Sequence, residues 1–181
     1  MKTSTRENYK KIIEICKDIY LKKSKDYGSA WRILRVTSLT DQIFIKAQRI
    51  RSIQEKNKMK VNENIEDEFI GIINYCLIAI IQLEYTGKDI EIDIKELEKL
   101  YDKYSNEIMD LLENKNHDYD EAWKEMRISS MTDIILMKLY RTKQIESNEG
   151  KTIISEGVKA NYQDIVNYSV FCLIKLLIFK T

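Results

Sequence analysis

The sequence contains two copies of one pattern, and this repeat limits the possible folds more than any other feature. The chain has two tryptophans, Trp31 and Trp123, and they occupy equivalent positions at an offset of 92 residues. After one inserted residue the offset becomes 93, so that Tyr75 meets Tyr168. A shared register of this length predicts two tandem structural units, covering residues 1–87 and 88–181. Further matching positions are Asp26 and Asp118, Tyr27 and Tyr119, Lys46 and Lys138, Arg49 and Arg141, Glu63 and Glu156, and Asn74 and Asn167.

Each unit is expected to contain three helices. The chain has no proline and only five glycines, a composition that favours long helices over turn-rich β folds. The charged segment 22–28 interrupts the first apolar helical pattern, which predicts a polar loop there. The third helix of each unit is apolar around most of its circumference and must therefore be surrounded. We expect an all-α helical bundle built from two three-helix repeats, packed about a pseudo-twofold axis into one globule.

Charge and cysteine usage exclude several classes of function. Lysine and arginine number 30 and aspartate and glutamate 29, so no global field draws the chain to nucleic acid, and general nucleic-acid binding is not expected. Cys16, Cys76 and Cys172 lie in apolar helical stretches without the spacing of a metal site. This pattern is typical of small buried hydrophobic residues in a reducing compartment.

Two apolar runs raise the question of a membrane. Residues 69–83 carry no charge but are shorter than the roughly 20 residues that span a bilayer, and Lys175 interrupts residues 165–179. Both runs are interpreted as core helices, not as membrane spans. The N-terminal residues also lack the apolar segment of an export signal. The sequence therefore predicts a cytoplasmic protein.

Polar residues mark the third helix of each unit. Asp67 and Asn74 share one predicted stripe with Glu63, and Glu156, Asp164 and Asn167 form the corresponding set in the second unit. Two interpretations stay open for the asparagines. They could contact a ligand, or they could clamp the two units together, because a buried amide without partners costs about 1–3 kcal/mol.

A lysine and an arginine lie three residues apart on the second helix of each unit, as Lys46 with Arg49 and Lys138 with Arg141. Side chains at this spacing are neighbours, and such a pair suits a phosphorylated ligand. The alternative is a solvated basic face or internal ion pairs. Both copies keep both residues although positions around them differ, which favours a functional role.

An aromatic and acidic segment precedes the second helix in both copies. It contains Asp26, Tyr27 and Trp31 in the first unit and Asp118, Tyr119 and Trp123 in the second. The aromatic rings could stack on a nucleotide base. The tryptophans could equally pack the segment onto the bundle, which is the more frequent role of a tryptophan beside a helix.

Longer stretches resemble a known family. The first unit resembles the nucleotide modification associated domain family, first type, in the stretches KDYGSAWRILRVTSLTDQIFIKAQRIRSIQ and EFIGIINYCLIAIIQLE. The second unit resembles the same family in NHDYDEAW, SSMTDIILMKLYRTKQIE and SEGVKANYQDIVNY. The resemblance implies an all-helical fold and an association with nucleotide metabolism or modified-base systems. The positions that match the family pattern are the Asp-Tyr segment, the Lys-x-x-Arg pair, the glutamate that opens the third helix and the Asn-Tyr within it.

A more distant similarity is to the all-α nucleoside triphosphate pyrophosphatases of the MazG and dimeric dUTPase kind. It implies acidic residues on paired helices that bind Mg²⁺ during cleavage between the α- and β-phosphates. Glu156 and Asp164 match one half of that arrangement. The chain departs from it where Lys46 and Arg49 replace an EExxE helix, and where Gly71 replaces the aspartate.

Together these features give three hypotheses. The first is a Mg²⁺-dependent nucleotide phosphohydrolase or pyrophosphatase, in which Glu63, Glu156 and Asp164 hold the metal and the basic pairs bind phosphate. The alternatives are a nucleotide-binding or regulatory module without catalysis, and a structural helical interaction protein. The sequence leaves open whether one or both units carry a working site, and whether two chains pair as a homodimer.

Overall fold

The computed structural model describes residues 3–56, 64–116 and 121–180, and every regular element in these ranges is helical. Each unit has three long helices, with a short 3₁₀ helix ahead of the second, so the predicted all-α fold of tandem units is confirmed. The first unit contains α1 (Thr3–Tyr27), η1 (Ala30–Ile33), α2 (Val36–Lys56) and α3 (Ile65–Glu84). The second contains α4 (Ile94–Asn116), η2 (Ala122–Glu125), α5 (Ile128–Ser147), α6 (Val158–Leu173) and the π-helix η3 (Ile174–Phe179).

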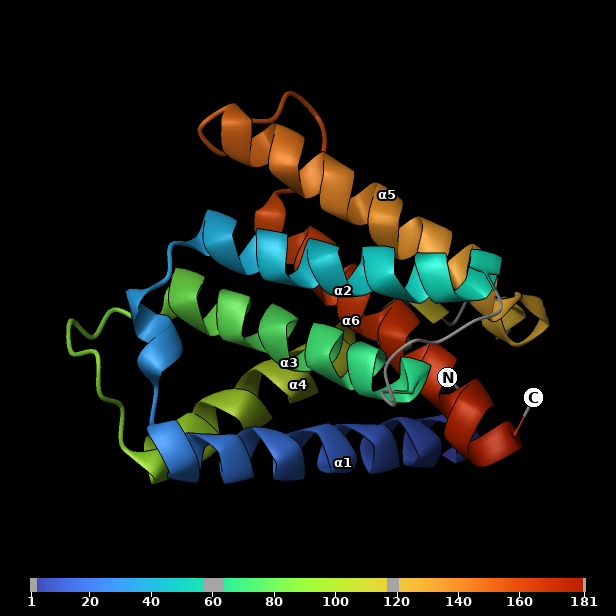
Figure 1. The fold of residues 1–181 in the computed structure, drawn as a ribbon, viewed down its shortest axis with the longest axis horizontal. Helices are drawn as coiled ribbons and strands as arrows, with labels where there is room; N and C mark the ends of the chain where they lie inside the picture. The colour runs from blue at the N-terminus through green and yellow to red at the C-terminus, as the bar shows by residue number, and fades with distance from the viewer. Residues whose placement is uncertain (1–2, 57–63, 117–120, 181) are drawn as a thin grey trace.

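The two third helices form the centre of the bundle. Helix α3 packs against α6, and α2 packs against both α3 and α5. Helix α1 packs against α4, and α3 lies between α1 and α2 (Figure 1). Phe69, Ile72, Ile73, Leu77 and Ile80 of α3 are fully buried. Helix α3 is apolar on most sides because neighbouring helices surround it, as the sequence predicted.

Contacts between the units are reciprocal. Thr40 donates a 2.6 Å hydrogen bond to Glu146, and the equivalent residues in the opposite direction, Gln54 and Thr132, are joined at 3.0 Å. Two salt bridges repeat the relationship: Arg51 with Asp133, and Lys143 with Asp41. Reciprocal contacts are what a pseudo-twofold arrangement requires. The axis itself stays a prediction.

One predicted loop is wrong. Segment 22–28 does not leave the helix: α1 continues to Tyr27, with its charged side chains exposed to solvent. Lysine is a good helix former, so loss of the apolar pattern there marked only the exposed end of the helix. The helix ends at Gly28, whose φ of +63° suits glycine and whose N–H donates to the Ser24 carbonyl at 2.9 Å.

The predicted stripe on the third helix of the second unit is also wrong in part. Helix α6 begins at Val158, after Gly157, whose backbone is extended. Glu156 therefore lies in the exposed segment that precedes the helix, while Asp164 and Asn167 lie within it. Glycine is a poor helix former, and this one separates Glu156 from the helix. Glu63 lies outside the described residues.

The cysteines lie in the interior, and the two apolar runs are mostly buried. Within the described part of the chain, Val158–Phe179 is long and apolar enough to cross a membrane, but more than half of that stretch is buried inside the bundle. Cys16, Cys76 and Cys172 are all buried and free. Burial raises the pKa of the Cys16 thiol to about 12, so it stays protonated and packs as a small hydrophobic group.

Candidate functional site

The first unit contains a cavity of about 380 Å³, bounded by α1, η1, α2 and α3. We call it the first-unit cavity. Its wall combines aromatic and charged side chains with the apolar residues Ile19, Ile70 and Ile78. The aromatic residues are Tyr20, Tyr27, Trp31 and Tyr75, and the charged residues are Lys23, Lys46, Asp67 and Glu68. Four of the predicted first-unit site residues, Tyr27, Trp31, Lys46 and Asn74, thus line one space.

Trp31 is held against the cavity by the hydrogen bonds of its neighbours. Ser29 Oγ donates to the Ile90 carbonyl at 2.6 Å and accepts from the Ile92 N–H at 2.8 Å. Arg32 Nη1 donates to Gln82 Oε1 at 2.6 Å. These bonds fix η1 to α3 and to the segment after it. They leave Trp31 only 8% exposed, with an indole N–H that donates to no acceptor among the described residues.

The predicted basic pair meets a carboxylate that the sequence interpretation missed. Arg49 Nη1 donates to Glu68 Oε1 at 2.6 Å, and Lys46 Nζ donates to Glu68 Oε2 at 3.2 Å. The Glu68 side chain is only 4% exposed, so both cations offset the cost of burying its charge. Glu66, Asp67 and Glu68 are consecutive, which hid the one that turns inward.

Gly71 makes room for Lys46. A Cβ at Gly71 would lie 2.8 Å from Lys46 Cε, so the lysine stem runs directly over the backbone of α3. The similarity to pyrophosphatases placed an aspartate at this position. The absence of a side chain instead lets Lys46 reach both Glu68 and the cavity.

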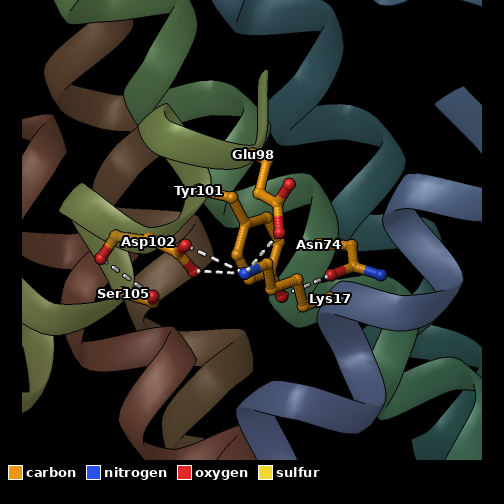
Figure 2. A network of polar contacts seen from close by, with 6 residues as sticks. All are labelled: Lys17, Asn74, Glu98, Tyr101, Asp102 and Ser105. Atoms are coloured by element: carbon orange, nitrogen blue, oxygen red, sulfur yellow. Dashed lines mark hydrogen bonds and ion pairs between the residues drawn. The ribbon is translucent and has the colours of Figure 1, made fainter. Parts of the chain in front are cut away.

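Asn74 is engaged as a clamp. Its Nδ2 donates to the Cys16 carbonyl at 3.0 Å, and its Oδ1 accepts from the Tyr101 hydroxyl at 2.9 Å (Figure 2). Close by, Lys17 pairs with Asp102 at 2.8 Å and with Glu98 at 3.0 Å, which also joins α1 to α4 (Figure 2). Asn74 therefore lies in the cavity wall, but its amide group is engaged in hydrogen bonds to Cys16 and Tyr101.

The second unit distributes the equivalent residues differently. Lys138 Nζ pairs with Asp164 at 2.5 Å, while Arg141 is exposed and lines a separate surface hollow. Asn167 accepts from the Tyr9 hydroxyl at 2.8 Å, which repeats the clamp. Trp123 is buried among aromatic rings. Asp118 and Tyr119 lie outside the described residues, and Asp26 is exposed on the last turn of α1.

The acidic partner of the lysine has moved by one helical turn between the units. In the first unit it is Glu68, with Gly71 one turn later. At the equivalent positions the second unit has Asn161 and then Asp164. Residues three apart share a helix face, so comparing the two copies at this spacing would have identified Glu68 from sequence.

The residues predicted to hold Mg²⁺ do not form a site in the described part of the chain. The Asp164 carboxylate pairs with Lys138, and Glu156 is exposed ahead of α6. No group of three or more His, Cys, Asp or Glu side chains among the described residues could hold a metal ion. Glu63 lies outside these residues, so the Mg²⁺ site stays a prediction.

Comparison with known proteins identifies the repeated unit. A family model described as nucleotide modification associated domain 1 matches residues 23–83 and, separately, residues 115–176. No curated protein and no solved structure matches the chain, so the distant similarity to MazG-type pyrophosphatases stays a prediction. The two matches cover more than half of the chain and each contains the basic pair and the asparagine of its unit. The protein therefore belongs to the nucleotide modification associated domain 1 family, with two tandem copies of that domain.

Proposed function

We propose that this protein binds a nucleotide in the first-unit cavity. The observation that carries the proposal is the convergence of Tyr27, Trp31 and Lys46, each repeated in both copies of the sequence, on one cavity. Small-molecule sites are concave, mostly apolar spaces of about 300–1,000 Å³ with a few polar groups. At about 380 Å³ the cavity is at the small end, which suits a mononucleotide.

The phosphate group would bind Lys46 and Lys23. Lys46 contacts Glu68 at 3.2 Å, while Arg49 holds the same carboxylate at 2.6 Å. If Lys46 turns toward a phosphate, Arg49 still pairs with the buried Glu68. The lysine is therefore available to an anion without leaving an uncompensated buried charge, the situation that costs most in a protein interior.

The base would lie among the aromatic side chains. Tyr27 is 55% exposed at the edge of the cavity, and Tyr75 of α3 lines the same space. Aromatic rings stack on any nucleobase because every base has a π-face. The exposed Asp67 carboxylate at the wall could accept a hydrogen bond from an amino group of the base or a hydroxyl of the sugar.

Binding without hydrolysis is the function that the described residues support best. Hydrolysis dependent on Mg²⁺ remains a second candidate because Asp67 and Glu68 line the same cavity as the two lysines. Glu68 is, however, already engaged by Lys46 and Arg49. A phosphate or pyrophosphate release assay with and without Mg²⁺ separates the two functions.

The proposal is tested by a thermal-shift screen followed by calorimetry. Ribo- and deoxyribonucleoside mono-, di- and triphosphates should include at least one that raises the melting temperature, since a ligand of the folded state must stabilise it. Lys46→Met should lower the affinity for that nucleotide about tenfold or more, equivalent to roughly 1.4 kcal/mol of binding free energy. Lys138→Met is the matched control, because Lys138 is the equivalent lysine beside Asp164. Its dissociation constant should equal that of the unmodified protein.

Two outcomes contradict the proposal. One is that no nucleotide in the panel changes the melting temperature. The other is that Lys46→Met and Lys138→Met bind the nucleotide equally well. Affinities, not melting temperatures, must be compared between the variants, because Lys138→Met leaves the Asp164 carboxylate without its lysine and lowers stability for a separate reason.

A further inference from the structure

We propose that the second unit does not bind ligand, because aromatic side chains fill the space that corresponds to the first-unit cavity. Each chain then binds one nucleotide, and the residue at position 78 in the first unit, or 171 in the second, decides whether the cavity is open. This inference rests on the proposed function for its ligand, but the difference in packing can be measured without one.

In the first unit an isoleucine stands at the deciding position. Ile78 of α3 lines the first-unit cavity together with Trp31 and is 7% exposed. Because Ile78 is part of the cavity wall, its side chain borders this space and does not fill it. Helix α3 ends at Glu84, and the segment after it is held by Arg32, whose Nη2 donates to the Gly87 carbonyl at 2.6 Å.

In the second unit a phenylalanine takes this position. The Phe171 ring stacks on the Trp123 ring, with centroids 4.3 Å apart and planes within 7°. Phe179 adds a second ring, 6.3 Å from Trp123 and tilted by 11°. Its equivalent in the first unit, at an offset of 93, is Thr86. Two phenyl rings therefore pack beside Trp123, whereas the first unit has Ile78 at the helix position equivalent to Phe171.

The helix that follows keeps the aromatic stack in place. Helix α6 is continued by η3, which carries Phe179, whereas α3 has no such continuation. Lys175 of η3 donates a 2.6 Å hydrogen bond to the Lys124 carbonyl of η2, next to Trp123. The C-terminal helix is thus attached to the element that bears the tryptophan.

The cationic side of the space has changed as well. Lys138 pairs at 2.5 Å with Asp164, which replaces Gly71, so a carboxylate stands where the first unit leaves room for its lysine. Asn161 replaces Glu68 and donates to the carbonyl of Gly157, the residue that precedes its helix. A phosphate would have to compete directly with Asp164 for Lys138.

The first experiment counts ligands by calorimetry with AMP, GMP, CMP, UMP and dTMP on the full chain. We expect one bound nucleotide per chain for whichever of these binds. Ile78→Phe, which copies the second unit, should lower the affinity at least 100-fold, while the conservative Ile78→Leu should retain it within a few fold. Phe171→Ile should leave it unchanged. Two nucleotides per chain, or unaltered binding by Ile78→Phe, would overturn the inference.

The second experiment needs no ligand and compares melting temperatures. A phenylalanine placed at position 78 enters open space, so Ile78→Phe should keep or raise the melting temperature. Phe171→Ile removes a stacked ring from a filled interior and should lower it, because the vacated space loses contacts. If no nucleotide binds but this asymmetry is found, the proposed function fails and the difference between the units stands. If both variants lose stability equally, the first unit is as tightly packed as the second and the inference fails.

Discussion

The Tyr9 hydroxyl donates a 2.8 Å hydrogen bond to Asn167 Oδ1, across the boundary between the two units. The equivalent residues make the same bond in the opposite direction, from Tyr101 to Asn74 Oδ1 at 2.9 Å (Figure 2). Burial raises the pKa of both tyrosines far above its usual value, so each hydroxyl stays neutral and donates. The first helix of each unit is thereby tied to the third helix of the other.

Removing one hydroxyl should destabilise the protein without altering its fold. Tyr9→Phe and Tyr101→Phe each leave a buried asparagine oxygen without its donor, which costs about 1–3 kcal/mol. The two losses should be similar to each other and roughly additive in the double variant. Urea denaturation followed by circular dichroism measures the free energy of unfolding. A loss for one tyrosine and none for the other would show that the two clamps are not equivalent.

Gly71 should control the position of Lys46. An alanine methyl there would meet the flexible end of Lys46, which can move aside, and alanine favours a helix by about 1 kcal/mol over glycine. We expect Gly71→Ala to keep or raise stability but to weaken nucleotide binding. Gly71→Asp, which copies Asp164, should weaken binding further by pairing with Lys46.

The control for these variants is Ala79→Gly on the same helix. It makes the opposite exchange between alanine and glycine at a fully buried position away from the cavity wall. It should lower stability while preserving affinity. If Gly71→Asp binds nucleotide as tightly as the unmodified chain, Lys46 does not contact the ligand.

The two halves of the chain should not fold as separate monomers. Helix α3 buries residues such as Phe69 and Ile80 with α6 as a main neighbour, and Asn74 depends on Tyr101 from the other half. A fragment of residues 1–87 would expose this apolar face. Circular dichroism and light scattering should show an unfolded or self-associated fragment, and mixing it with residues 88–181 should restore cooperative unfolding. A monomeric 1–87 fragment that unfolds cooperatively would contradict this.

Much of the fold could be predicted because it follows from repetition and periodicity. The register of Trp31 with Trp123 predicts two units, and the apolar circumference of the third helices predicts that they lie at the centre. Helix ends were less predictable: exposed charges after Lys22 resemble a loop, and Gly157 detaches Glu156 from α6. The local pattern of polar and apolar residues does not show which surface of a helix a neighbouring element covers, so it does not fix where the helix ends.

The candidate site could be predicted only in part, for a related reason. The basic pair was found because both copies keep it. Glu68 was missed because the two copies do not match at this position. The carboxylate that pairs with the lysine is Glu68 in the first unit, but in the second unit it is Asp164, one helical turn later. Ile78 gave no signal at all. An apolar residue becomes informative only when its neighbours show whether the space beside it is open or, as at Phe171, filled.

Glu146 should make stability depend on pH. Its carboxylate accepts hydrogen bonds from Thr40 at 2.6 Å and from Tyr162 at 3.3 Å. Burial, the largest cause, raises the pKa of Glu146 above its usual value of 4.5, and nearby Asp41 adds to the rise. The hydrogen bonds and Lys143 oppose it without cancelling it.

Because this pKa is higher in the folded than in the unfolded chain, the folded state binds more protons once the pH exceeds 4.5. The contribution of Glu146 to stability is therefore greatest in acid and is lost as the pH rises through the folded pKa. Glu146→Gln keeps an acceptor for Thr40 and removes the charge. The variant should match the unmodified protein near pH 4 and be more stable at pH 7, as measured by melting temperature.

The other unit supplies the reverse experiment. Gln54 occupies the position equivalent to Glu146 and bonds Thr132 at 3.0 Å, so a neutral amide is already accommodated at this contact. Gln54→Glu should introduce a second group whose charged form is disfavoured, and should lower the melting temperature at pH 7 more than at pH 4. Equal effects of either substitution at both pH values would mean that burial does not perturb this carboxylate, and that the contact serves only to join the units.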